Sequence, residues 1–239
     1  MAWRFTPRWY SVLLTALALP LFTSLGFWQW HRGQARQAQW DEFARGDAPA
    51  IPASAASLAG LPRFARVQIE GVPDGERQFL LENISHRGAP GYYVLTVLRL
   101  AEGSRLLVNR GWVPFTGFRE QLPDVRLPEG AQDAWTVSGR IGGLPVAGLA
   151  SGQVGPPLLG TWPRVASFPA REQLEASYGA PLLPVVLLLD DGETPGYLRE
   201  WAPSGLPPER HVGYAVQWWA LAVLLAGLFV GVNLKKSDD

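Results

Sequence analysis

Two long apolar runs, one near each end of the chain, frame a middle segment in which apolar and polar residues alternate. The runs cover residues 9–30 and 212–234, and neither contains a charged residue. A helix rises 1.5 Å per residue, so a run of this length spans about 33 Å, enough to cross a hydrocarbon core of roughly 30 Å. The pattern therefore predicts two transmembrane helices.

The first run also has to be weighed against a cleaved signal peptide. Its only A-x-A sequence near the start, at residues 16–18, lies inside the apolar run, where it is poorly placed for cleavage. The run is long and ends in the aromatic cluster of Phe27, Trp28 and Trp30, as expected at a membrane interface. These features favour a retained anchor.

The charges beside the two runs predict the orientation in the membrane. Arg4 and Arg8 precede the first run, and Lys235 and Lys236 follow the second. The positive-inside rule then places both termini in the cytoplasm and, in a bacterium, the middle segment in the periplasm beside the inner membrane. The expected domains are a cytoplasmic N-terminus at 1–8, transmembrane helices at 9–30 and 211–234, a periplasmic domain at 31–210 and a cytoplasmic C-terminus at 235–239.

Period-two alternation between the helices predicts strands. The clearest case is 64–70, which we expect Gly71 to end. Further strands are predicted at 78–84, 92–100, 105–113, 135–141 and 182–189, with a tight hairpin at 101–104. The predicted fold class is two transmembrane helices flanking an antiparallel, β-rich domain with one short helix.

The remaining segments have their own signatures. The short helix is expected between Pro169, in its first turn, and Gly179, with Leu174 and Tyr178 on one face. Residues 31–46 are expected to continue the first helix. The segments 48–61 and 142–160 are predicted to be a linker and a loop.

Composition excludes several classes of protein. Basic and acidic residues balance at 21 each, apolar residues make up 47%, and there is no cysteine. The chain therefore has no disulfide scaffold, thiolate zinc site, iron–sulfur cluster or thiol nucleophile. The balanced charge gives no support for nucleic-acid binding.

Catalytic motifs are absent from the sequence, so we expect no enzyme. A G-x-S-x-G motif, a Walker A loop and a G-x-G-x-x-G loop are missing. Asp190, Asp191 and Glu193 are a candidate cation cluster, although a solvated turn is the favoured interpretation. A hydrolase would require a pocket joining these acids to His86, which is more simply a turn residue.

Histidine and aromatic residues gather where each apolar run adjoins the middle segment, at the C-terminal end of the first run and the N-terminal end of the second. His31 ends the first run and His211 begins the second, near Trp28, Trp30, Tyr214, Trp218 and Trp219. On the second helix, His211, Ala215, Trp218 and Ala222 share one face. The alanines predict a shallow surface on which a flat macrocycle could lie below the imidazole.

Two further features favour haem binding, although the same residues also have a plainer interpretation. A helix N-terminus favours the neutral imidazole that iron requires, and Arg32 and Arg36 could pair with propionates. Tryptophan, tyrosine and histidine are, however, ordinary anchors at a membrane interface. Gly26, Gly33 and Gly213 would then simply let the helices pack closely.

Three motifs resemble those of the Surfeit locus assembly factors of cytochrome c oxidase. They are L-G-F-W-Q-W-H-R at 25–32, G-Y-Y-V-L-T at 91–96 followed by L-V-N-R-G-W-V-P at 107–114, and H-V-G-Y-A-V-Q-W at 211–218. They occur in the family's order across nearly the whole chain. The sequence departs from the family pattern at Val97, where a proline is usual, and in 161–173.

The resemblance implies a role in building oxidase subunit I together with other assembly factors, with haem a bound or handed over. His211 corresponds to the family's second-helix histidine and is the implied axial ligand of the haem iron. Tyr214, Trp218, Trp28 and Arg32, from the same motifs, are the further candidate haem contacts. His31 falls at an open motif position. A cofactor-free partner that stabilises subunit intermediates is the alternative.

The Asn109–Trp112 stretch also has an interpretation in physical terms. Arg110 follows a buried strand, so it needs carboxylate or carbonyl partners. Gly111 allows a positive φ, and Trp112 supplies an apolar anchor. We favour a structural corner here over a docking site for the oxidase.

Overall fold

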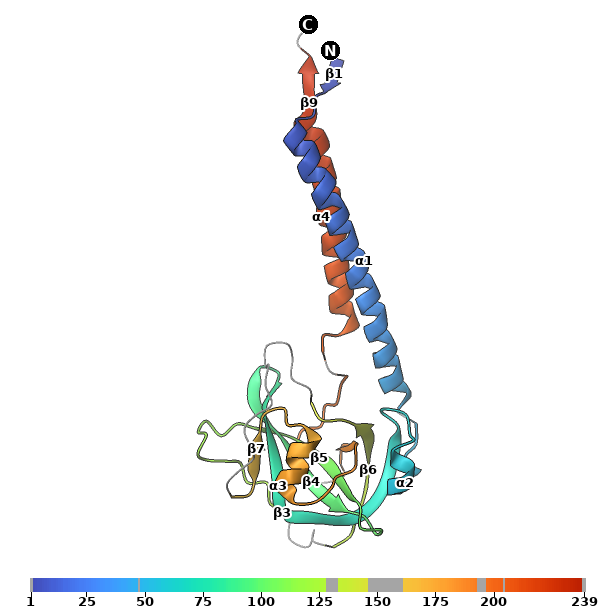
Figure 1. The fold of residues 1–239 in the computed structure, drawn as a ribbon, viewed down its shortest axis with the longest axis vertical. Coiled ribbons are helices and arrows are strands. Elements are labelled where there is room, and N and C mark those ends of the chain that lie inside the picture. The colour runs from blue at the N-terminus through green and yellow to red at the C-terminus, as the bar shows by residue number, and fades with distance from the viewer. Residues whose placement is uncertain are drawn as a thin grey trace. The chain divides into compact units, whose positions relative to one another are not determined.

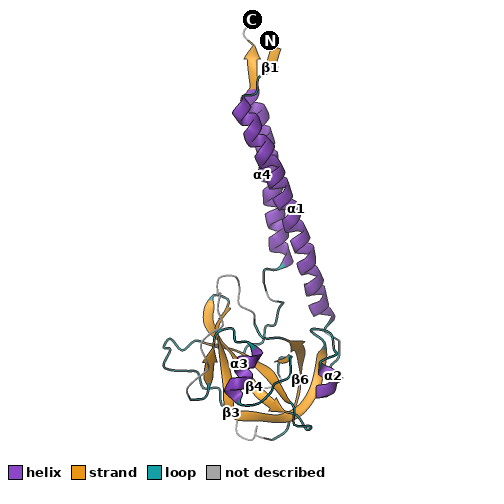
Figure 2. Cartoon of the chain, viewed as in Figure 1, coloured by secondary structure: helices purple, strands orange, loops and turns teal. Residues whose placement is uncertain are grey.

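The computed structural model describes residues 2–46, 48–127, 133–145, 161–192, 197–203 and 205–237. The chain divides into two compact units. The first joins Met1–Asp41 to Pro203–Asp239, and the second is Glu42–Ala202. Figure 1 traces the helices and strands along the chain, and Figure 2 colours them by type.

Two long helices make up most of the first unit. Helix α1 is Trp9–Arg45 and helix α4 is Pro208–Asn233, and both are long and apolar enough to cross a membrane. They run antiparallel, because Arg8 contacts Asn233 at one end of the pair and Gln29 contacts His211 toward the other. The predicted continuation of α1 to about residue 46 is confirmed. Helix α4 begins three residues before His211, with Pro208 at its first position.

Small residues form the line along which α1 and α4 meet. Gly26, Gly33, Ala215 and Ala222 are all buried. A Cβ atom on Gly26 would lie 2.2 Å from Nε1 of Trp219, so only glycine fits there. Gly213 does not share this role, because a Cβ there would meet open space. Of the three glycines expected to allow close packing, two therefore do so, as small-residue interfaces in membranes require.

A two-stranded ribbon continues the helix pair beyond its Asn233 end. Strand β1 (Ala2–Phe5) pairs antiparallel with β9 (Leu234–Ser237). No strands were predicted here: residues 2–5 and 235–237 were expected only as terminal segments, and Leu234 was expected in the second helix, which ends at Asn233. In Figure 1, the two strands lie side by side at the ends marked N and C.

The second unit is built around a closed barrel. Its strands are β3 (Arg66–His86), β4 (Ala89–Arg99), β5 (Arg105–Pro114), β6 (Trp135–Gly142) and β8 (Val186–Leu189). They are hydrogen-bonded in the order β3-β4-β5-β8-β6, and β6 returns to β3. Five-stranded barrels of this kind occur in OB-type domains.

The strand assignments confirm most of the sequence prediction and correct three points. Gly71 does not end a strand, since β3 runs through it as one long strand with a register shift between Pro73 and Gln78. Strand β8 begins at Val186, not at 182. It pairs parallel with β5, so the sheet is mixed where a purely antiparallel one was expected.

Short elements surround the barrel. Strand β2 (Ile51–Pro52) and helix α2 (Ala55–Leu58) occupy the segment predicted to be a linker, and β7 (Arg164–Ala166) was not predicted. Helix α3 is Arg171–Tyr178, and Gly179 ends it with φ +85°. Pro169 lies just before this helix, not in its first turn. Of the predicted loop 142–160, residues 146–160 lie outside the described residues.

Alternation along the strands separates the barrel interior from its outer face. All five strands contribute to one buried apolar cluster, which must therefore fill the interior. Its largest members include Ile69, Leu98, Leu106, Ile141 and Leu187. The intervening residues of β3 and β4 face outward, where Leu174 and Tyr178, which share one face of α3 as predicted, cover them.

Candidate functional site at His211

His211 lies in the first turns of α4, inside the helix pair. Its side chain is buried, with 8% of the residue exposed. Nδ1 lies 2.9 Å from Oε1 of Gln29 on α1. The histidine also packs over Gly33, where an added Cβ would lie 3.4 Å from the Cβ of His211.

The contact with Gln29 determines what each ring nitrogen does. An amide oxygen only accepts a hydrogen bond, so Nδ1 of His211 must donate it. In the neutral ring, Nε2 then carries the lone pair. A histidine that ligates a metal usually has this arrangement, with its other ring N–H held by a carbonyl oxygen.

The four residues predicted to share one face of α4 do so, but this face is not an open surface. Ala215 is fully buried and Ala222 nearly so, because this face forms the contact with α1. Trp218 is half-buried, and its ring lies 5.5 Å from that of Phe22 on α1. The expected resting place for a macrocycle below the imidazole is therefore filled by α1. The physical reason is that small side chains let a second helix approach.

The predicted haem contacts lie beside this contact line. Trp28 and Arg32 are four residues apart and form one stripe of α1, and both are exposed. Tyr214 and Trp218 are likewise four apart on α4, with Tyr214 exposed. Because the helices are antiparallel, helical geometry brings the two stripes to the same side of the pair.

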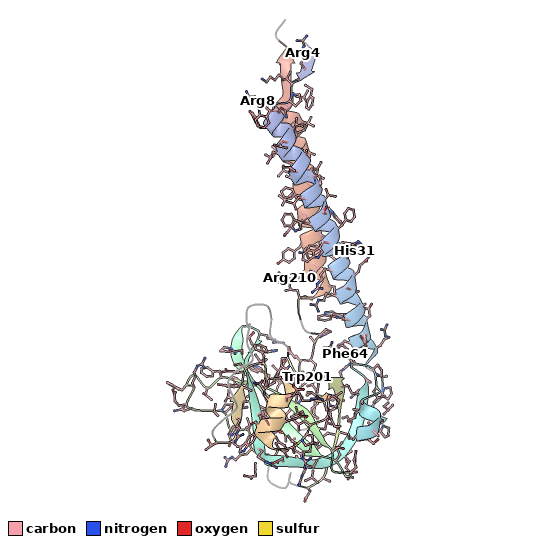
Figure 3. The ribbon with its side chains drawn as sticks, viewed as in Figure 1. Arg4, Arg8, His31, Phe64, Trp201 and Arg210 are labelled. Carbon is pink, nitrogen blue, oxygen red and sulfur yellow. The ribbon has the colours of Figure 1, made fainter. Side chains whose placement is uncertain are left out.

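A second aromatic group occupies the opposite side of the contact line. Trp219 packs against Phe27 and Trp30, with ring centroids 5.5 and 6.2 Å away. His31, which Figure 3 labels on α1, is exposed. The two histidines therefore differ in exposure: His211 is buried between the helices and His31 is exposed. Gln29 and Gly33, two residues before and after His31, both lie against His211.

Gln29 was not predicted as a site residue, although it contacts His211. It was quoted within the first motif but given no role. A signal was present, because an uncharged polar side chain inside an apolar span usually bonds to a neighbouring helix. Its partner could not be named without knowing which faces of the helices meet.

The Asn109–Trp112 stretch belongs to the barrel. Arg110 is 2% exposed, and its Nη1 donates to Oε1 of Gln78 (2.7 Å) and to the carbonyl oxygen of Val125 (2.8 Å). Its guanidinium carbon lies 4.7 Å from the ring centre of Tyr197. Burial lowers the pKa of Arg110 below its ordinary value. The prediction that Arg110 needs carboxylate or carbonyl partners is confirmed, and the partners are oxygens without formal charge.

The residues after Arg110 form a tight corner. Gly111 has φ +123°, and a Cβ there would lie 2.8 Å from the carbonyl oxygen of Leu198. Nε of Arg199 donates to the Arg110 carbonyl at 2.6 Å, and Nε1 of Trp112 donates to the Ile84 carbonyl at 3.2 Å. These contacts are internal to the β domain, in keeping with the favoured structural corner.

The two described acids considered for a cation site, Asp190 and Asp191, form no metal-binding group with His86. Asp190 pairs with Arg66 at 2.7 Å, and Glu193 lies outside the described residues. His86 stacks near Trp112 and lies 3.6 Å from a carboxylate oxygen of Glu200, beside a cavity of about 20 Å³. Within the described part of the chain, no group of three metal-binding side chains comes together.

Comparison with known proteins identifies the class of this chain. The model of the SURF1 family matches residues 16–223, which include both helices' facing segments and the barrel. A SURF1-like protein of Dictyostelium discoideum is 43% identical over 49 residues, which make up 20% of this chain and 18% of that protein. The aligned segment thus spans less than a fifth of the relative's length.

The chain therefore belongs to the SURF1 family, as the three motifs indicated. This family is known for the assembly of cytochrome oxidase.

Proposed function

We propose that this protein is a membrane-bound assembly factor for cytochrome c oxidase and that His211 receives haem a for the maturation of subunit I. Membership of the SURF1 family supports the role in assembly. The observation that carries the haem part is the bond between Nδ1 of His211 and Gln29, which leaves the lone pair on Nε2. Subunit I and other assembly factors are the proposed partners.

Each nearby side chain has a part in this proposal. Gln29 fixes the orientation of the imidazole and keeps its proton on Nδ1. Trp28, Tyr214 and Trp218 supply aromatic surface beside the contact line. Arg32, exposed at the edge of the same stripe, supplies a guanidinium suited to a carboxylate.

The donor set fits the proposed cargo. Haem a offers an iron with an axial position for an imidazole nitrogen, and propionate carboxylates at its edge. A neutral histidine suits the iron, while an arginine suits a propionate. The charges at the chain's ends support the proposed topology in the bacterial inner membrane, with both termini cytoplasmic and the β domain periplasmic.

The test is the absorption spectrum of the full chain, purified from membranes of cells that also make haem a. We expect a haem band from the unmodified protein and its loss in His211→Ala. His31→Ala is the matched control, because it removes an exposed histidine two residues from Gln29 and should keep the band. Gln29→Leu should weaken haem binding about tenfold, since removing the partner of a ligating histidine costs that much.

Full haem content in His211→Ala would remove His211 from the proposal. Protein that is colourless under every haem supply, yet co-purifies with subunit I, would support the second candidate, a cofactor-free scaffold. One observation favours that candidate: α1 covers Ala215 and Ala222, the face of α4 expected to hold the macrocycle. The two candidates share the assembly role and differ only in the cargo.

A further inference from the structure

The ribbon of β1 and β9 is amphipathic across its two faces. Its register pairs Arg4 with Lys235, and Phe5 with Leu234. Side chains of directly paired residues project from the same face of a ribbon. One face therefore carries Arg4 and Lys235, while the other carries Phe5, Leu234 and, in the next pair, Trp3 opposite Lys236.

Among the residues that the structure describes, few cover the apolar face of the ribbon. Trp3 is 65% exposed and Phe5 is 50% exposed. Phe5 makes one edge contact with Phe229 of α4, at 5.8 Å between ring centres. Large aromatic side chains left exposed next to a membrane span are typical of residues in the lipid interface.

The basic face pairs like charges. Arg4 and Lys235 lie directly opposite each other, an arrangement that destabilises a sheet unless an anion lies nearby. Arg8 adds a cation just beyond the ribbon and Lys236 adds one on the other face, while residues 2–13 and 229–237 contain no acid. Two acids, Asp238 and Asp239, follow in the sequence, outside the described residues.

The ribbon is fixed to the helix ends. A two-stranded ribbon is only marginally stable alone. Here the backbone N–H of Thr6 donates to the Asn233 carbonyl at 2.9 Å, and the N–H of Arg8 donates to Oδ1 of Asn233 at 3.3 Å. Ser11 donates to the same Oδ1. The basic and aromatic faces are therefore held at the end of both spans.

From this arrangement we infer that the β1–β9 ribbon is a binding surface for anionic phospholipids of the membrane that α1 and α4 span. Trp3, Phe5 and Leu234 enter the interface between headgroups and acyl chains. Arg4 and Lys235 hold the phosphate of an anionic headgroup between them, which relieves their repulsion. This surface is independent of His211 and of the oxidase role.

The test uses the full chain, delipidated in neutral detergent, and counts bound lipid by native mass spectrometry. Dioctanoyl phosphatidylglycerol is the probe, and dioctanoyl phosphatidylcholine and inorganic phosphate are the comparisons. We expect the anionic lipid to bind most tightly. Arg4→Gln with Lys235→Gln should weaken its binding about 30-fold, or roughly fivefold for each basic residue lost near an anionic surface.

Three further variants separate this effect from misfolding and from total charge. Arg87→Gln with Arg126→Gln removes the same charge from exposed sites of the β domain and should leave binding unchanged. The swap Arg4→Lys with Lys235→Arg should retain it. Asp238→Asn with Asp239→Asn should tighten it.

Equal binding of the two lipids, or wild-type affinity in the Arg4/Lys235 variant, would overturn the inference. Binding of inorganic phosphate as tight as that of the lipid would point to a free anion and would also overturn it.

Discussion

Arg110 in the β unit and His211 in the helix unit are both buried basic side chains, and they differ in how many partners hold them. Arg110 lies in a closed barrel, where Gln78, the Val125 carbonyl and the Tyr197 ring surround it. His211 lies between two helices, with one hydrogen-bonding partner, Gln29. A side chain held on many sides is fixed within the fold, whereas Gln29 contacts only Nδ1 of His211, and Nε2 is the nitrogen that the proposed function assigns to a ligand.

The architecture explains the difference. The barrel has no free edge among its five strands, so its interior residues face only one another. The helix pair has a single contact line, and many of its apolar side chains away from that line are exposed. The Asn109–Trp112 stretch is therefore held by contacts within the β domain, whereas the candidate site lies in the helix pair.

The strongest test of this contrast is Arg110→Ala. We expect a loss of about 3 kcal/mol in the stability of the β domain, because the change leaves a cavity and unpaired polar groups around Gln78. Pulse proteolysis of the full chain in urea measures it. His211→Ala should leave this unfolding transition where it is.

Equal unfolding midpoints for Arg110→Ala and the unmodified chain would show that the cage around Arg110 is not stabilising. The contrast with His211 would then fail on the side of the barrel.

The contact line of the helix pair is tested by Gly26→Leu. Trp219 fills the space beside Gly26, so a larger side chain must separate the helices, at a cost of about 2 kcal/mol. Because the chain has no cysteine, spin labels can be placed at Leu21→Cys and Val223→Cys alone. We expect the distance between the labels to lengthen.

Gly213→Leu is the matched control, because its Cβ meets open space on the same helix pair. An unchanged label distance in Gly26→Leu would contradict the assigned contact line, and so would an equal shift in both variants.

How much of the fold could be predicted depended on the range of the interactions involved. Alternation gave β4, β5 and β6 to within a few residues, and the hairpin between β4 and β5, because these depend on neighbours in sequence. The parallel pairing of β5 with β8 joins strands about 80 residues apart, and periodicity carries no trace of it. The passage of β3 through Gly71 depends on two different partner strands.

The candidate site shows the same limit. The sequence predicted that His211, Trp28 and Tyr214 lie near one another, because the ends of the two spans that carry them are expected at the same membrane surface. Which face of α4 meets α1 depends on the fit of Trp219 over Gly26, a contact between distant segments. For this reason the face of α4 at Ala215 was predicted to be open, and no role was predicted for Gln29.

The smallest expected effect concerns pH and the β domain alone. Partial burial by itself would raise the pKa of Asp74, but hydrogen bonds from the Tyr178 hydroxyl (2.8 Å) and from the backbone and side chain of Arg77 outweigh it and hold that pKa below its usual range. The unfolded chain therefore binds this proton more readily, so the stabilisation is complete above about pH 4 and is lost as the pH falls through the folded pKa.

Asp74→Asn should consequently flatten the acid limb of the stability curve of the β domain below about pH 4, by no more than about 1 kcal/mol, because Arg77 is partly exposed and water screens the pair. Urea unfolding followed at pH 3 and pH 7 measures the slope. Glu172→Gln, at an exposed carboxylate on α3, is the matched control and should change the slope less. If both variants retain the slope of the unmodified protein, the link from Asp74 to α3 through Tyr178 contributes nothing. The acid sensitivity of the barrel would then have to come from its other ion pairs, of which Arg66 with Asp190 is the shortest among the partly buried ones.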